Sequence, residues 1–282
     1  MSYHDITVVI TTFKSESKIY DCLNSINPSV KIIVIENSNN LKFKEKLEIE
    51  YPNLKCYLAG ENLGYAKGNN FGLAKVKSKF ALIINPDARL GDSALENFFK
   101  SCKAKQDFAI ISPFIQERND NNINNQLEKK DLVEVDNVKG FAMFLNIEQF
   151  RDVGYFDDNF FIYFEEIDLC RRIKKKKKKI YLDPSIKIFH AGGQSHDVDI
   201  NFEMELSRNW HWMWSTFYYH KKYKGYLIAL TMVFPKLISA FFKTIFYTFT
   251  FSKEKKLIYF QRVSGLANAI LCKKSWYRPK VY

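Results

Sequence analysis

The segment Phe80–Asp87, FALIINPD, is an apolar run that ends in Asn-Pro-Asp, and it decides the fold. Two similar runs precede it, ITVVI at Ile6–Ile10 and KIIVI at Lys31–Ile35, and apolar residues at helical spacing lie between the runs. Short apolar runs bounded by turn residues predict buried strands. Strands that alternate with helices form βαβ units, so the sequence predicts an α/β fold with a mainly parallel central sheet flanked by helices.

The remaining elements extend this pattern to about residue 200. From Phe202 onward only helical patterns occur, so we expect an α/β domain over residues 1–200 and a helical, basic and aromatic region over residues 201–282. The Asn-rich segment Gln116–Asp131 is expected to be a loop or a long hairpin tip. Further strands are expected at Lys55–Leu58, Ala109–Ser112, Val133–Leu145, Ile180–Leu182 and Ile186–Phe189, and helices around residues 19–26, 71–76 and 95–102 and at Tyr163–Lys175.

The composition limits the class of protein. Of 282 residues 46% are apolar and 16% aromatic, which excludes a disordered chain. The 5 cysteines are scattered without a C-x-x-C pair, which argues against a disulfide framework and a zinc ribbon and favours reduced thiols. The net charge of +12 is concentrated after residue 202, where 14 Lys and Arg face 3 Asp and Glu. That region is expected to meet a polyanionic partner, either a membrane surface or a nucleic acid.

The most apolar stretch of the chain is Tyr226–Ser252. Lys236 and Lys243 interrupt it and Pro235 is expected to break it, so no uninterrupted span of about 18–20 residues is predicted. Basic residues flank this stretch on both sides, which favours lipid over nucleic acid, and we expect an element that lies in the plane of an anionic membrane. A buried helical pair that covers the sheet, or a tilted or re-entrant helix, are the alternatives.

Polar residues follow the expected strands at the edge where an open parallel sheet binds ligands. Any single one of them could be an ordinary turn residue, but four separate segments reach the same edge. The candidates for binding a ligand there are Thr11, Thr12, Glu36, Asn37, Asn62, Gly64, Lys67, Asn69, Asn85 and Asp87.

The loop after the third strand carries glycines at 60, 64, 68 and 72. This spacing allows either close approach of the backbone to a ligand or close packing of a helix on the sheet. It matches neither a P-loop nor the dinucleotide fingerprint.

Two clusters could carry chemistry. Asp87 ends an apolar strand, where a carboxylate suits a divalent cation bridging to a diphosphate, although an Asp in a Pro-initiated turn is common. The second cluster consists of Glu165, Glu166 and Asp168 near the start of an expected helix, directly after the aromatic segment Phe160–Phe164. Apolar surroundings raise the pKa of a carboxyl group towards that of a useful general base. The alternative is that these acids complement the helix dipole. His190, at another strand end, is either a ligand or a structural histidine.

Six motifs in this order resemble family-2 glycosyltransferases of the GT-A fold, and rhamnosyltransferase-like enzymes most of all. They are VVITTF, IIVIEN, ENLGYAKGNNFG, NPD, GYFDDNFFIYFEEIDLCRR and IFHAGGQS, between about Ile6 and Ser195. The resemblance implies an inverting transfer from a nucleotide-diphosphate sugar with Mg²⁺ or Mn²⁺. This sequence differs from the usual family pattern at three positions. Glu36 stands where Asp is common, Asn85 replaces the first acid of a D-x-D motif, and Glu166 stands where Asp is the commoner base.

Carried onto matching positions, the resemblance implies that Thr11, Glu36 and Asn62 hold the nucleoside. Asp87 would lie at the metal and diphosphate site, which His190 completes. Glu166 matches the general base, with Glu165 beside it.

The expected function is therefore an inverting glycosyltransferase that uses a dTDP-rhamnose-like or UDP-hexose donor. Its acceptor would be a lipid-linked or growing surface polysaccharide, and its location the inner face of the cytoplasmic membrane, as a peripheral cytoplasmic protein. A nucleic-acid-binding α/β protein and a sugar nucleotidyltransferase are the alternatives, and no nucleic-acid partner is expected.

Overall fold

The computed structural model describes residues 2–113, 132–190 and 196–280. Its residues group into two compact units, the first containing 1–156 and 166–197 and the second 157–165 and 198–282. The expected Asn-rich loop Gln116–Asp131 and the motif residues 191–195 lie outside the described residues.

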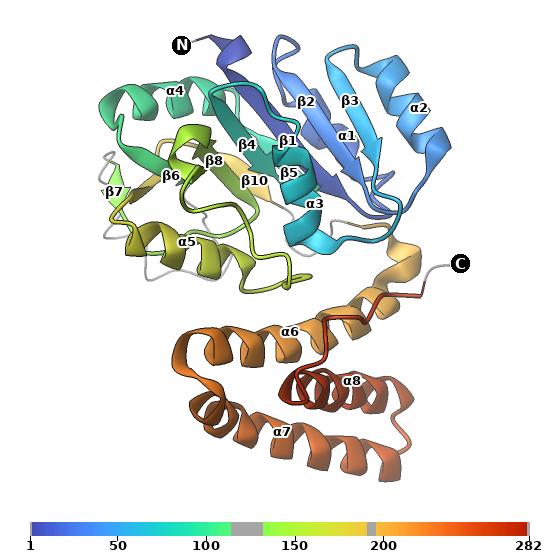
Figure 1. Cartoon of the computed structure of the whole chain (residues 1–282). Helices are drawn as coiled ribbons and strands as arrows, with labels where there is room; N and C mark the ends of the chain where they lie inside the picture. The colour runs from blue at the N-terminus through green and yellow to red at the C-terminus, as the bar shows by residue number, and fades with distance from the viewer. Residues whose placement is uncertain (1, 114–131, 191–195, 281–282) are drawn as a thin grey trace. The chain divides into compact units, whose positions relative to one another are not determined.

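The first unit is built on a sheet whose strands pair in the order β3-β2-β1-β4-β8-β6-β9-β7 (Figure 1). β1 runs parallel to β2 and β4, β2 to β3, and β6 to β9, whereas β8 and β7 are antiparallel to their neighbours. The predicted mainly parallel sheet is confirmed. The strands are β1 Ile6–Thr12, β2 Lys31–Glu36, β3 Leu54–Leu58, β4 Phe80–Ile84, β5 Ala88–Leu90, β6 Phe108–Pro113, β7 Val133–Glu134, β8 Ala142–Asn146, β9 Lys179–Asp183 and β10 Ile188–His190.

Helices flank this sheet, and all of them except the one at Leu41–Glu50 overlap helices that the sequence predicts. They are α1 Ile19–Asn24, α2 Leu41–Glu50, α3 Gly64–Leu73, α4 Ala94–Ala104 and α5 Glu165–Lys175. The core between α4 and the sheet is aromatic: the ring of Phe144 lies 4.8 Å from that of Phe98 and 5.2 Å from that of Phe80. All three side chains are fully buried.

Four predicted boundaries are wrong. The strand expected at Ile186–Phe189 is β10, which spans Ile188–His190. The single strand expected over Val133–Leu145 is divided into β7 and β8, because the polar residues between them are exposed and do not pair with a neighbouring strand. The helix expected from Tyr163 begins at Glu165, since Tyr163 and Phe164 have φ values of 72° and 71°, outside the helical region. The helix expected around residues 71–76 ends at Leu73 and includes the glycine-rich stretch from Gly64.

The sheet register brings the polar strand ends together. Thr12 at the end of β1 lies opposite Glu36 at the end of β2, and β4 runs parallel to β1 on its other side. A separate two-stranded pair continues from β4: β5 runs antiparallel to β10, with Ala88 opposite His190. The residue before Ala88 is Asp87, so this pairing brings the carboxylate and the imidazole next to each other.

The second unit is helical, as predicted, and consists mainly of α6 Asn201–Lys224, α7 Tyr226–Phe249 and α8 Lys253–Ile270. Trp210, Phe217, Val233 and Leu266 are fully buried where the three helices meet. α6 and α8 approach so closely that a Cβ on Gly265 would lie 2.2 Å from the carbonyl oxygen of Trp210. Only glycine fits this crossing.

The expectation that Pro235 breaks the apolar stretch is wrong, because α7 is one continuous helix of 24 residues with Pro235 inside it. The proline ring removes a single backbone donor, and packing of the buried side of α7 on α6 and α8 outweighs that loss. Among the described residues α7 is the one helix long and apolar enough to cross a membrane by length and composition, and only 17% of its most apolar stretch is buried. It is therefore not the buried helix that one alternative predicted.

Candidate active site

Asp87 and His190 form the first part of the site. The Asp87 side chain is almost fully buried, and its Oδ1 lies 3.4 Å from Nε2 of His190. The imidazole ring stacks on Phe141, with 4.7 Å between ring centroids. Cys22 of α1 lies close enough that the negative charge of Asp87 adds to burial in raising the pKa of the Cys22 thiol. The sequence prediction that Asp87 and His190 share one site agrees with this geometry.

A cavity of about 410 Å³ opens beside this pair. Its lining includes two cationic side chains that the sequence analysis did not select, Lys18 and Arg89. Arg89 lies on β5, two residues after Asp87, and both residues line this cavity. Positive charge beside a buried carboxylate suits an anionic ligand that carries its own cation.

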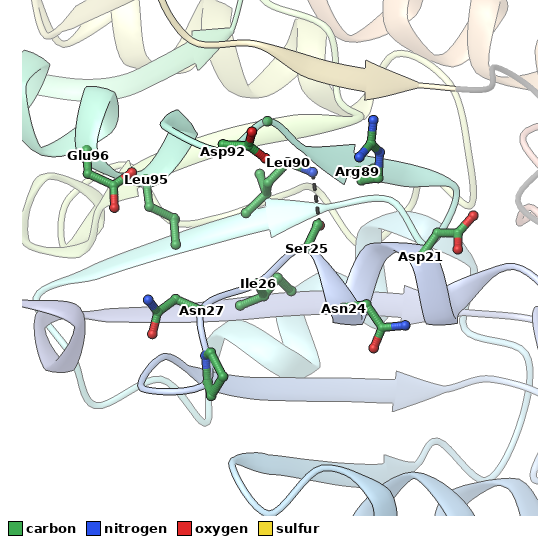
Figure 2. A pocket seen from close by; sticks show the side chains of 12 residues that line it. Asp21, Asn24, Ser25, Ile26, Asn27, Arg89, Leu90, Asp92, Leu95 and Glu96 are labelled. Carbon is green, nitrogen blue, oxygen red and sulfur yellow. Dashed lines mark hydrogen bonds between the residues drawn. The ribbon is translucent and has the colours of Figure 1, made fainter.

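A second cavity of about 460 Å³ lies between α1 and the β5–α4 segment and is also lined by Asp21 and Arg89. Figure 2 shows both side chains at one end of this cavity, with Asn27 and Glu96 at the other. Its floor is fixed by the Leu90 amide, which donates to Ser25 Oγ at 3.0 Å. Because Asp21 and Arg89 line both cavities, the two cavities adjoin at this pair.

The donor set at Asp87 fits one divalent cation that is shared with a ligand. A carboxylate oxygen and an imidazole nitrogen 3.4 Å apart can both ligate the same ion. Nitrogen and oxygen donors suit Mn²⁺, and Mg²⁺ commonly takes only one or two protein ligands besides water and phosphate oxygens. No group of three or more metal-ligating side chains occurs in the described part of the chain, so the remaining ligands would come from the substrate and water.

Glu166 forms the second part of the site. Burial raises the pKa of its carboxyl group above the ordinary value of 4.5. Among the described residues its Oε2 is buried without a hydrogen-bond partner. A carboxylate with a raised pKa and an unused oxygen is able to accept a proton from a bound hydroxyl group.

Residues Gly140 and Phe141 connect the two parts of the site. The Phe141 ring stacks on the His190 imidazole. The backbone carbonyl of Phe141 accepts a hydrogen bond from the backbone amide of Asn85 at 2.8 Å. At the preceding residue, a Cβ on Gly140 would lie 3.7 Å from the Cβ of Glu166. The hydroxyl of Tyr65 donates to the Gly140 carbonyl and ties this segment to α3. The segment Gly140–Phe141 thus lies between Glu166 and the Asp87–His190 pair at one end of the sheet, although Glu166 does not line the cavity beside Asp87.

The other two acids of the predicted cluster have different surroundings. Asp168 is fully buried and accepts from Nε of Arg172 at 2.8 Å. The remaining nitrogens of Arg172 donate to the carbonyls of residues 153–155. Asp168 therefore positions the Arg172 guanidinium, which holds the loop before α5 in place. Glu165 is buried and belongs to the second unit, where it follows the left-handed pair Tyr163 and Phe164.

That left-handed pair is fixed by aromatic contacts within the second unit. The Trp212 ring lies 5.3 Å from Tyr163 and 5.4 Å from Phe164, and Tyr219 lies 5.2 Å from Phe164. Two successive non-glycine residues with positive φ carry backbone strain, which persists only where surrounding contacts hold it. Strain directly before the two glutamates is the pattern found at functional sites.

The candidate nucleotide residues on β1 and α3 make contacts with each other. Thr11 Oγ1 donates to Asn69 Oδ1 at 3.1 Å, and Asn69 Nδ2 donates to the Tyr65 carbonyl at 2.9 Å. Thr12 Oγ1 donates to the Ile35 carbonyl at 3.3 Å. Of these three hydrogen bonds, the one between Thr11 and Asn69 links α3 to the sheet. Lys67 of α3 is exposed.

Glu36 and Asn37 differ in what they leave available. Both carboxylate oxygens of the buried Glu36 accept backbone amides, from Ser38 at 2.8 Å and from Asn40 at 2.7 Å. Asn37 Nδ2 donates to the Gly64 carbonyl at 3.2 Å, while its buried Oδ1 has no hydrogen-bond partner among the described residues. An unpaired buried acceptor costs free energy unless a ligand donor meets it. Asn37 is therefore a stronger candidate for contacting a nucleoside than Glu36.

The glycines of α3 mostly serve packing. A Cβ on Gly68 would lie 2.5 Å from Thr11 Cγ2, and a Cβ on Gly72 would lie 2.5 Å from Val9 Cγ1. The alternative of close helix–sheet packing thus explains these two positions. Gly64 is the first residue of α3 and has a φ of 74°. Its backbone amide donates a hydrogen bond to Asn62 Oδ1 at 3.1 Å.

Comparison with known proteins agrees with this fold. The family model described as Glycosyl transferase family 2 matches residues 7–172. The rhamnosyltransferase WbbL of Escherichia coli K12 is 28% identical over 235 residues, covering 72% of this chain and 86% of WbbL. The low-salt glycan biosynthesis hexosyltransferase Agl10 of Haloferax volcanii is 24% identical over 198 residues. That match covers 62% of this chain and 64% of Agl10, less than two thirds of the relative's length.

The structure of the mannosyltransferase PcManGT from Pyrobaculum calidifontis, in complex with GDP-Man and Mn²⁺, shares the fold. Its TM-score is 0.61 at 12% identity, with 96% of this chain and 88% of that chain covered. This likeness defines the fold as GT-A-like. The chain belongs to glycosyl transferase family 2.

Proposed function

We propose that the protein is an inverting, metal-dependent glycosyltransferase. It transfers a sugar from a nucleotide-diphosphate donor, dTDP-rhamnose-like or UDP-hexose, to a hydroxyl of a lipid-linked or growing surface polysaccharide. The observation that carries the proposal is that Gly140 lies next to Glu166, while the adjacent Phe141 stacks on His190, which lies 3.4 Å from Asp87. It supports one site that has an anion-binding side and a proton-accepting side.

The anion-binding side would hold the donor diphosphate. Lys18 and Arg89 line the cavity beside Asp87 and would pair with phosphate oxygens. Asp87 and His190 would hold Mg²⁺ or Mn²⁺, which when bound neutralises the negative charge that develops on the leaving diphosphate. The buried Asn37 amide oxygen would accept a hydrogen bond from the nucleoside.

The proton-accepting side would activate the acceptor. The acceptor hydroxyl attacks the anomeric carbon from the face opposite the diphosphate, and the Glu166 carboxylate takes its proton as the new bond forms. The bond from the anomeric carbon to the diphosphate oxygen breaks in the same displacement. A single displacement inverts the anomeric configuration and needs no covalent intermediate.

The test is a donor panel of thymidine-, uridine- and guanosine-diphosphate sugars with Mg²⁺ or Mn²⁺, scored by thermal stabilisation and donor hydrolysis. We expect at least one donor to stabilise the chain and to be hydrolysed slowly, with the anomer of the released sugar opposite to that of the donor. Release of pyrophosphate from a nucleoside triphosphate and a sugar phosphate would instead identify a nucleotidyltransferase. Retention of the donor's anomeric configuration would overturn the inverting mechanism.

A further inference from the structure

The exposed side of α7 is an apolar surface that extends along the whole helix. Large apolar side chains are exposed from its first turn to its last, including Leu227, Phe234, Phe241, Phe242, Phe246 and Phe249. The opposite side, with Ala229, Val233 and Ala240, is buried against the other two helices of the unit. Monomeric soluble proteins rarely expose a continuous apolar surface of this kind without a partner.

The two lysines of α7 lie to one side of this surface. Successive helical residues are about 100° apart and residues seven apart nearly coincide, so Phe242 and Phe249 share one line and Lys236 and Lys243 another. Lys243 Nζ lies 5.0 Å from the centroid of the Tyr259 ring on α8. Burial lowers the pKa of the His220 imidazole on α6, and the nearby charges of Lys224 and Lys236 lower it further, so Lys236 lies close to α6. Both cations therefore lie near the neighbouring helices, and the apolar surface contains no charged side chain.

The segments at the two ends of α7 are both basic. Lys221, Lys222 and Lys224 precede it, and Lys253, Lys255 and Lys256 follow it. Glu254 is the one acid between residues 221 and 256. An apolar surface bordered by cations along one side and at both ends is complementary to a bilayer with anionic headgroups, where each lysine near the surface contributes about 1 kcal/mol.

The same features favour an in-plane position over a membrane-spanning one. A spanning α7 would place Lys236 and Lys243 on either side of the bilayer centre, where each costs about 2.5–3.5 kcal/mol on insertion scales. It would also carry α6 and α8, which pack along its buried side, into the hydrocarbon. Lying in the plane, α7 buries its phenylalanines and leaves every lysine at headgroup level.

We propose that α7 docks the protein in the plane of an anionic membrane surface through its Phe242 and Phe249 side. The proposal does not depend on the glycosyltransferase assignment, because its evidence lies wholly in the second unit. Location at the inner face of the cytoplasmic membrane would place the enzyme beside a lipid-linked acceptor, and that step does rest on the proposed function.

The first test is flotation of the full chain with preformed phosphatidylcholine vesicles, with and without phosphatidylglycerol. We expect binding to the anionic vesicles that weakens without phosphatidylglycerol or in high salt. Phe242→Glu combined with Phe249→Glu should lower vesicle affinity by at least about tenfold for each phenylalanine. Lys236→Glu combined with Lys243→Glu should lower it by about fivefold for each lysine. The control is Ile49→Glu, which changes an apolar residue of α2 that is 83% exposed and should leave binding unchanged.

The second test asks how α7 lies. In a Cys272→Ser background, Lys224→Cys and Lys253→Cys each introduce one exposed thiol at one end of α7, and both should react with a membrane-impermeant reagent added outside the vesicles. Protection of one position would mean that α7 spans the bilayer and would overturn the in-plane proposal.

Three results would overturn membrane docking itself: no vesicle binding by the unmodified chain, unchanged binding of the double phenylalanine variant, or self-association in solution that only this variant abolishes. Salt-sensitive retention on RNA that competes with vesicles would assign the basic region to nucleic acid. Because all these changes are at exposed positions, circular dichroism should be unaltered. Donor binding measured in parallel distinguishes failure of this proposal from failure of the proposed function.

Discussion

The two units of the chain differ in which side chains they bury and which they expose. The first unit buries carboxylates at Glu36, Asp87 and Asp168, and the large apolar side chains that it exposes among its described residues are few and scattered. The second unit has a well-packed centre but exposes an apolar side along all of α7. Glu36 and Asp168 are compensated by hydrogen bonds within the first unit. Burial of the Asp87 carboxylate costs folding free energy, and the exposed apolar side of α7 leaves hydrophobic free energy unused, so neither of these two features is explained by folding alone.

The difference indicates two kinds of partner. A buried carboxylate beside cations is suited to a small, charged ligand that replaces lost hydration with specific contacts. An uncharged apolar side bordered by lysines is suited to an extended surface without defined contacts. The comparison predicts that changes in one unit affect one kind of binding and leave the other intact.

The largest effect is expected from Glu166→Gln, which removes the proton acceptor and keeps the shape. We expect sugar transfer to fall by about 10²–10⁴-fold, with vesicle binding unchanged. Because burial raises the pKa of Glu166, the folded state favours the neutral form, and stability falls as pH rises from 4.5 through the raised pKa. Glutamine carries no charge, so the melting temperature near neutral pH should stay the same or rise.

The control for this variant is Glu148→Gln, which makes the same chemical change at a side chain that is 67% exposed. For the unmodified enzyme, the acidic limb of the pH–rate profile should have its midpoint above 4.5, and Glu166→Gln should remove that limb. Near-normal turnover in Glu166→Gln would transfer the base role to Glu165.

A somewhat smaller effect is expected from Asp87→Asn, which keeps a polar group but removes the charge next to His190. We expect transfer to fall by about 10²–10³-fold, because the leaving diphosphate loses the electrostatic stabilisation arranged at that position. When Mn²⁺ is titrated in the presence of the donor, the transfer rate should depend less on the Mn²⁺ concentration in Asp87→Asn than in the control Asp107→Asn. Asp107 is an exposed aspartate in the same unit. Equal metal dependence in the two variants would place the cation elsewhere.

The sequence predicted the first unit well because its signals are local. An apolar run that ends in a polar turn identifies a strand and its carboxyl end, and parallel pairing then brings Thr12, Glu36 and Asn85 to one edge. The Asp87 and His190 pair could also be expected, since both residues end or follow strands. The residue types alone could not show that Glu36 and Asn69 use their polar atoms within the protein.

What the sequence missed depends on long-range antiparallel pairing. Gly140 and Phe141 connect the two parts of the site because β8 pairs with β4, and Arg89 reaches the cavity because β5 pairs with β10. No local pattern specifies those partners. In the second unit, composition predicted helices and a basic apolar region, but only the packing shows which side of α7 is left exposed.

The next effect concerns stability within the second unit. Gly265→Ala places a methyl group against the Trp210 carbonyl, and backbone atoms cannot move aside as a side chain can. We expect about 1–3 kcal/mol of destabilisation, partly offset by the better helix propensity of alanine, and a lower midpoint in helical circular dichroism. Lys256→Ala, an exposed change on the same helix, should leave the midpoint unaltered. Donor binding should survive in Gly265→Ala, and its loss at the same temperature as helicity would show that the two units unfold together.

The smallest effect sharpens the comparison through pH. His211 of α6 is fully buried, where its Nε2 donates to the Tyr277 carbonyl at 2.9 Å and its Nδ1 accepts from Ser275 Oγ at 3.0 Å. Burial lowers the pKa of His211 from 6.5 to about 3, so the folded state holds it neutral. An unfolded chain takes up the proton below 6.5, and stability should therefore be full above that pH and fall as the pH decreases towards 3. The loss should be at most about 1.4 kcal/mol for each pH unit, measured by urea unfolding followed through helical circular dichroism.

His211→Gln should flatten this pH dependence of stability, and His4→Gln, at an exposed position, should not. If His211→Gln keeps the full acid sensitivity, the helical unit is destabilised through another group, and the packing of the C-terminal segment on α6 does not control its response to pH.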